Sequence, residues 1–145
     1  MDSLFIAVEL SPLSVWARED AYAYFAALIG HAIGMALLVG GGIAVSLCRL
    51  GILPAEQWPA LRGFLRVMGV GAVLATLSGL VLLVAYPAKA LTNPVFAVKF
   101  ACLVTAALLL RVPGRGAAAG GLLLWLGGVA AGKLLLHTAT VLTVS

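Results

Sequence analysis

The sequence predicts an all-α, polytopic membrane protein, in which a short interfacial helix precedes an antiparallel, up-down bundle of four transmembrane helices. Three observations predict this class. Of the 145 residues, 63% are hydrophobic and only 10% are charged. The mean hydropathy is +1.17, and short breaks separate four long apolar segments. Because a soluble domain carries roughly 25% charged residues, this chain has too little polar surface to fold by itself in water.

Each apolar segment is about as long as a bilayer crossing requires. A hydrocarbon core about 30 Å thick needs roughly 20 apolar residues of helix, at a rise of about 1.5 Å per residue. The expected spans are residues 22–47, 63–86, 94–110 and 116–144, within a single domain over 21–145. Because the breaks are short, neighbouring spans must run in opposite directions, and both ends of the domain lie on one side.

The breaks contain residues that are typical of helix ends. Gly51 and Pro54 follow the first span, and Pro87 closes the second. Asn93 offers an N-cap to the third, with Pro94 at the first helical position, where its missing N–H does no harm.

Residues 1–20 are expected to form a short interfacial segment and not a cleaved signal peptide. Asp2 stands where a signal peptide has basic residues, and Glu9 interrupts the apolar stretch. Ser11 and Pro12 are expected to start a second turn of this segment.

The basic residues predict the orientation. The connections after the first and third spans contain five arginines and one acid: Arg49, Arg62, Arg66, Arg111, Arg115 and Glu56. The opposite side has only Arg18 and Lys89 as basic residues, with four acids. By the positive-inside rule, both termini lie in the periplasm of a bacterial inner membrane. Single cations at span ends meet lipid head groups, so the net charge of +4 indicates the bilayer as a partner and not nucleic acid.

Three small-residue motifs predict close helix packing: Gly30-x-x-x-Gly34, Gly116-x-x-x-Gly120 and Gly128-x-x-x-Gly132. Such faces let helix backbones approach closely in lipid. The partner helix could belong to the same chain, to a second copy or to another subunit.

Four ionisable side chains lie inside the expected spans: His31, Lys99, Lys133 and His137. Ionisable groups at membrane depth are costly unless they are paired or hydrated. His31 lies about nine residues inside one helix and His137 about seven residues before the end of another, at ends that face the same side. Lys99 falls in the same leaflet, and Lys133 lies one turn from His137 on the same face. We therefore expect one His/Lys pocket in the periplasmic half.

One interpretation of this pocket is a b-type haem site. His31 and His137 would ligate the iron from facing helices, and Lys99 and Lys133 would neutralise the propionates. Candidate walls are Trp125, Tyr24 and Tyr86. The protein would then be a cytochrome-like electron-transfer subunit that acts between a periplasmic redox protein and membrane quinone.

The alternative is a non-catalytic structural or accessory membrane subunit. His31 would then form an interhelical hydrogen bond, and Lys99 would extend to the near interface. Lys133 could hold an anionic group, such as a lipid phosphate, or a quinone oxygen. No span contains Asp or Glu, which weighs against proton relays and ion-coupled transport. No catalytic triad, zinc motif or P-loop occurs, so an enzyme acting by itself is not expected.

Three stretches resemble a group of small bacterial four-helix integral membrane proteins of unknown function. They are His31-Ala-Ile-Gly-Met-Ala-Leu-Leu-Val-Gly40, Asn93-Pro-Val-Phe-Ala-Val-Lys99 and Leu124-Trp-Leu-Gly-Gly-Val-Ala-Ala-Gly-Lys133. The resemblance spans nearly the whole chain and implies the bundle, the membrane location and a polar pocket of His31, Lys99 and Lys133.

The chain departs from this group in one place. Members often carry a further histidine near the end of the third helix, where this chain has Leu109, Leu110 and Arg111. If that histidine holds a cofactor in the group, His137 would have to replace it here.

Overall fold

The computed structural model describes residues 2–54 and 58–141, and every regular element in these ranges is a helix. Three helices contain segments long and apolar enough to cross a membrane: α3 (Ala21–Arg49), α4 (Trp58–Ala85) and α7 (Arg115–Val141). Four are shorter: α1 (Asp2–Glu9), α2 (Pro12–Glu19), α5 (Pro87–Leu91) and α6 (Pro94–Leu109). The sequence prediction of an all-helical chain is confirmed for the described residues, and three of these helices could span a membrane.

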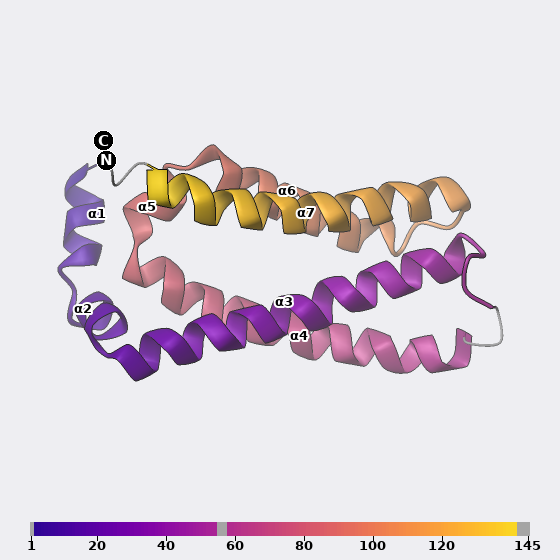
Figure 1. Ribbon diagram of the computed structural model, residues 1–145, viewed down its shortest axis with the longest axis horizontal. Helices are drawn as coiled ribbons and strands as arrows, with labels where there is room; N and C mark the ends of the chain where they lie inside the picture. The colour runs from indigo at the N-terminus through magenta and orange to yellow at the C-terminus, as the bar shows by residue number, and fades with distance from the viewer. Residues whose placement is uncertain (1, 55–57, 142–145) are drawn as a thin grey trace.

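Helices α3, α4, α6 and α7 lie lengthwise beside one another, with α3 and α6 running one way and α4 and α7 the other (Figure 1). Helix α3 packs against α4 and α7, and α6 packs against α7. Three of the expected spans match α3, α4 and α6 within a few residues. The fourth, 116–144, matches α7 up to Val141, and its last three residues lie outside the described part. The 16 residues of α6 extend only about 24 Å.

The closest helix crossing joins α3 to α4 through two glycines. A Cβ atom at Gly34 would lie 2.5 Å from the backbone nitrogen of Ala75, and one at Gly71 would lie 2.8 Å from the carbonyl oxygen of Gly34. Backbone cannot yield as a flexible side chain can, so only glycine fits at both positions. The motif that contains Gly34 therefore packs inside this chain.

Further along α3, the core is built around Trp125 of α7. The indole is fully buried, and it packs with Val39, Val45, Met68 and Ala106. A Cβ at Gly42 would lie 2.2 Å from an indole carbon. Small residues on α3 thus make room for one large aromatic ring from α7.

Two of the predicted helix ends, at Gly51 and at Asn93, have the hydrogen bonds expected of them. At the end of α3, the N–H of Ile52 donates to Leu47 and that of Gly51 to Cys48, with Gly51 at a φ of +77°. This is a Schellman motif, in which glycine adopts the left-handed conformation at lowest cost. At the start of α6, the Asn93 side chain accepts a 2.9 Å bond from the N–H of Val95.

The N-terminal segment consists of two helices. Helix α2 begins at Pro12 and is capped by Ser11. Helix α1 lies across the end of the four longer helices (Figure 1). The buried hydroxyl of Ser14 donates to the carbonyl oxygen of Val84 at 2.8 Å. The Arg18 guanidinium donates to the carbonyl of Glu9 at 2.7 Å. These bonds tie α2 to α4 and to α1.

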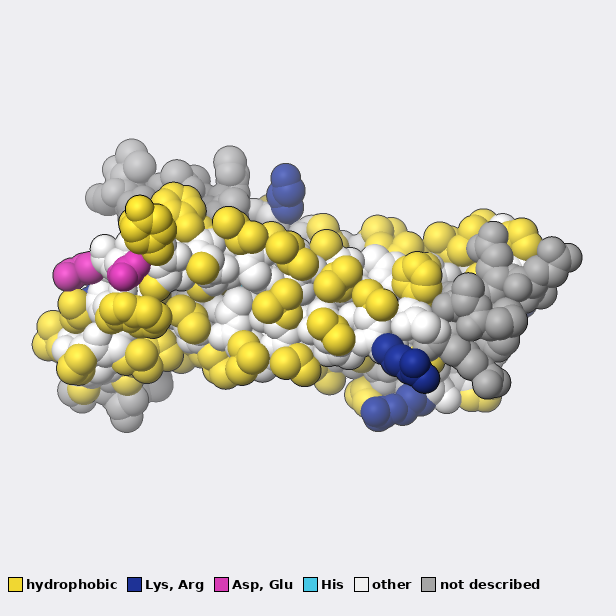
Figure 2. All heavy atoms as spheres, turned by 90° about the horizontal axis from the view of Figure 1, so that it is seen from below, with side chains coloured by type: hydrophobic (Ala, Val, Ile, Leu, Met, Phe, Trp, Pro, Cys, Tyr) yellow, Lys and Arg dark blue, Asp and Glu magenta, His cyan; other side chains and the backbone are white. Residues whose placement is uncertain are grey.

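Large apolar side chains are exposed along all four longer helices. Val70 and Leu77 on α4, Phe25 on α3, Leu123 on α7 and Val104 on α6 are each more than half exposed. Figure 2 shows this apolar surface over the middle of one face, with acidic side chains visible at the left end. A soluble protein rarely exposes so continuous an apolar surface, whereas lipid tails would cover it.

Candidate functional site

The structure brings together His31 and Lys99, two of the four ionisable residues predicted within spans. His31 lies on α3 and Lys99 on α6, and both side chains are half-buried. The Nζ atom of Lys99 lies 3.4 Å from Nε2 of His31. Two helices that are far apart in the sequence therefore meet through one polar contact.

The other ring nitrogen of His31 fixes which atom carries a proton. Nδ1 lies 3.0 Å from the carbonyl oxygen of Ala75 on α4. A carbonyl can only accept, so Nδ1 is the donor, and the neutral ring keeps a lone pair on Nε2. Lys99 then donates to Nε2. The interhelical hydrogen bond, one of the two interpretations of His31 from the sequence, is present.

Small residues from the other two helices surround this pair. A Cβ at Gly79 of α4 would lie 3.2 Å from the His31 ring, and one at Gly132 of α7 would lie 3.8 Å from Nζ of Lys99. The buried Ser78 hydroxyl lies 3.5 Å from Nδ1 of His31. We define the His31–Lys99 site by these two residues, which contact elements from all four longer helices.

Among the side chains that the structure describes, no carboxylate pairs with Lys99. The sequence contains no Asp or Glu after Glu56, and none of α3, α4, α6 or α7 contains an acid. Asp20 precedes α3 by one residue and stands eleven residues before His31, a separation of about 16 Å along a helix. A charged ammonium at Lys99 therefore has no anionic partner among the described residues.

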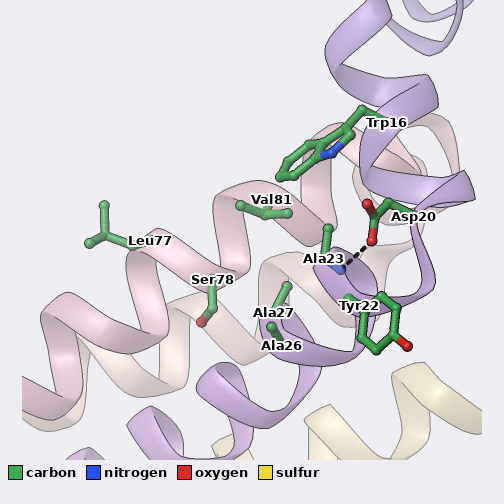
Figure 3. Close-up of a pocket in the computed structure, with 9 residues that line it drawn as sticks. All are labelled: Trp16, Asp20, Tyr22, Ala23, Ala26, Ala27, Leu77, Ser78 and Val81. Carbon is green, nitrogen blue, oxygen red and sulfur yellow. Dashed lines mark hydrogen bonds between the residues drawn. The ribbon is translucent and has the colours of Figure 1, made fainter.

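An open groove lies beside the site, between α2, α3 and α4. Figure 3 shows its lining, with Trp16 and Tyr22 toward the α2 end and Ser78 among small and aliphatic side chains. The remaining lining residues are Asp20, Ala23, Ala26, Ala27, Leu77 and Val81. Ser78 lines this groove, and its hydroxyl lies 3.5 Å from Nδ1 of His31, so one residue connects the groove with the site.

The other predicted site residues do not join this pair in the described part of the structure. Lys133 is exposed on α7, immediately after the Gly132 that faces Lys99. His137 belongs to α7, but its side chain lies outside the described side chains. Of the candidate pocket walls, Tyr24 and Tyr86 contact each other edge to face, with ring centroids 6.2 Å apart. Trp125 belongs to the core against Gly42.

Metal or haem binding at His31 would require one specific change. Nδ1 of His31 donates to Ala75, so only the Nε2 lone pair could ligate iron. In this geometry that lone pair accepts from Lys99. Among the described residues, no group of three or more His, Cys, Asp or Glu side chains is placed to hold a metal ion.

Sequence reasoning missed the groups that orient His31. The acceptor on α4 is the backbone carbonyl of Ala75. Every residue has a backbone carbonyl, so the sequence does not indicate which one His31 contacts. The Ser78 hydroxyl donates to the carbonyl of Leu74 on its own helix at 2.6 Å, as serine hydroxyls in helices commonly do. Its further contact with His31 depends on how α3 and α4 are rotated about their axes.

No family model, curated protein or solved structure matches this chain. The resemblance to small bacterial four-helix membrane proteins therefore stays a prediction from the sequence.

Proposed function

We propose that the chain is a four-span membrane protein, in which α6 crosses the bilayer together with α3, α4 and α7. Helix α6 packs along α7 and exposes Val98, Phe100, Val104 and Leu108, as a lipid-facing helix would. Helix α6 is about 6 Å shorter than a hydrocarbon core about 30 Å thick. Local thinning of the bilayer accommodates such a difference at a modest cost. The arginine-rich ends would face the cytoplasm of a bacterium, and both termini the periplasm.

Within this membrane protein, we infer a binding function for the His31–Lys99 site. The ligand class is a membrane-soluble molecule with an anionic group or a carbonyl oxygen, such as a quinone or a lipid. The observation that carries this proposal is the Lys99 amine, which lies 3.4 Å from His31 Nε2 with no carboxylate on the surrounding helices. A lysine has three donors and uses one on His31. The others can bind an acceptor that the ligand brings.

Electron transfer through a b-type haem is the second candidate, and a different observation favours it. Histidines that ligate metals usually donate their second ring N–H to a carbonyl or carboxylate, which fixes the orientation of the ring. His31 has this arrangement through Ala75. Haem binding would require Lys99 to leave Nε2, and the second axial ligand would be His137, as predicted from the sequence.

One purification distinguishes these candidates. The protein is expressed in haem-replete cells, purified in mild detergent, examined by optical spectroscopy and then extracted with solvent for mass spectrometry of bound small molecules. The binding proposal predicts a retained quinone or lipid that is lost from Lys99→Met and kept by Lys133→Met, the matched exposed lysine. A b-haem difference band that is lost in both His31→Ala and His137→Ala would contradict the binding proposal and support electron transfer. A colourless, folded protein whose retained molecules do not change in Lys99→Met would contradict both candidates and support a structural or accessory subunit.

A further inference from the structure

The end of the molecule opposite α1 and α2 contains three arginines, at the end of α3, in the turn after α6 and at the start of α7. The Arg49 guanidinium donates through Nη1 to the carbonyls of Leu109 and Leu110, both at 3.2 Å, and through Nη2 to that of Val112. Its charge therefore lies against the turn that contains Arg111. The Arg115 guanidinium donates at 2.8 Å to the carbonyl of Leu50, which is the residue directly after Arg49. We call Arg49, Arg111 and Arg115 the arginine end.

These charges are not neutralised within the described part of the chain. The bonds of Arg49 and Arg115 go to backbone carbonyls, which carry no net charge, and the described residues form no salt bridge at this end. Arg111 and Arg115 are exposed. A guanidinium has five N–H groups, and the one bond described for Arg115 leaves donors for an external anion.

The arginine end also lies where phosphates would lie if the apolar helices cross a bilayer. Arg49 ends one candidate span and Arg115 begins another. Apolar side chains lie close by in the sequence and are exposed: Leu108 by 52%, Val112 by 46% and Ile52 by 65%. A ligand here would meet positive charge at one level and apolar surface next to it, which is the chemistry of a phospholipid.

We propose that the arginine end is a binding site for an anionic phospholipid. The phosphate and the charged head group pair with Arg111 and Arg115, and the acyl chains lie along the exposed apolar side chains. Because Arg49 and Arg115 are already held by backbone carbonyls, less conformational freedom is lost on binding. Basic clusters beside transmembrane helices attract anionic head groups by about 1 kcal/mol for each cation near the surface.

The experiment is a lipid titration of the full-length protein in neutral detergent, followed by native mass spectrometry. Phosphatidylglycerol is compared with phosphatidylcholine for the unmodified chain, Arg111→Gln, Arg115→Gln and Lys133→Gln. The last variant removes an exposed cation from another part of α7. Each arginine variant should weaken phosphatidylglycerol binding about fivefold, whereas Lys133→Gln and all phosphatidylcholine affinities should stay the same.

Arg111→Gln is the critical variant, because no described hydrogen bond of the fold uses its side chain and the protein should fold normally. An unchanged phosphatidylglycerol affinity in this variant would overturn the proposal. An equal loss in Lys133→Gln would also overturn it, since the attraction would then come from overall charge. Displacement of the lipid by millimolar inorganic phosphate would show that the site takes free phosphate, which contradicts a lipid site.

Discussion

Gly34 of α3 and Gly71 of α4 face each other across the helix crossing, so that a Cβ on Gly71 would lie 2.8 Å from the carbonyl oxygen of Gly34. This contact sets the distance between α3 and α4. Since His31 lies one turn from Gly34, the same crossing places its imidazole against Ala75 and Gly79. The Gly34–Gly71 crossing therefore also determines where His31 lies relative to α4.

Substitution at this crossing should destabilise the protein. In Gly34→Ala, the new methyl group meets the backbone of α4, which can move only if the helices separate. We expect a loss of about 1–3 kcal/mol, as for other overpacked sites, measured by unfolding in mixed detergent micelles. The control is Gly40→Ala on the same helix, where a Cβ meets nothing within 4 Å. It should leave stability unchanged or raise it by about 0.5–1 kcal/mol, and equal losses in both variants would contradict the crossing.

The contact between Gly42 and Trp125 predicts a coupled pair of substitutions. Gly42→Ala should cost about 1–3 kcal/mol, because the indole is buried on all sides. Trp125→Phe shortens the ring and forfeits no hydrogen bond, since the indole nitrogen has no partner among the described residues. The double variant should lose less stability than the sum of the two single losses, by at least about 0.5 kcal/mol. Strict additivity would show that the two residues do not touch.

Ser14 should hold the N-terminal helices onto α4. Helix α4 ends at Ala85, so the carbonyl of Val84 is among the last four, which have no acceptor role inside the helix, and Ser14 supplies its donor. Ser14→Ala should cost about 1–3 kcal/mol and speed proteolysis at Arg18. Ser46→Ala is the matched control: Ser46 is equally buried, but its hydroxyl bonds only Gly42 of its own helix. Equal proteolysis of both variants would contradict this docking contact.

The helices were predictable because their signals are local. Apolar length gave α3, α4, α6 and α7, and the Asn93 cap and Gly51 bend marked ends that the structure confirms. The five-residue α5 was not predicted, because it is too short to leave a hydrophobic pattern. Pro87 at its first position is the one local signal for it.

The site was less predictable, because it depends on how each helix is rotated. The prediction that His31 and Lys99 lie at a similar level agrees with their contact. A similar level was not enough for Lys133, since the adjacent Gly132 faces Lys99 and the next residue on a helix points about 100° away. The faces that glycines turn toward a neighbour therefore decide which polar residues meet, and a pattern in one helix does not contain that information.

The His31–Lys99 site depends on a neutral imidazole at His31, which donates through Nδ1 to Ala75 of α4 and accepts through Nε2 from Lys99. The most direct test is ¹⁵N solid-state NMR of histidine- and lysine-labelled protein in lipid bilayers, in a His137→Gln background that leaves one ring to observe. We predict a protonated Nδ1, an unprotonated Nε2 and a through-space correlation from Nε2 to a lysine Nζ, which disappears in Lys99→Met. A protonated Nε2, or a spectrum that Lys99→Met does not change, would contradict the hydrogen bond between Lys99 and His31.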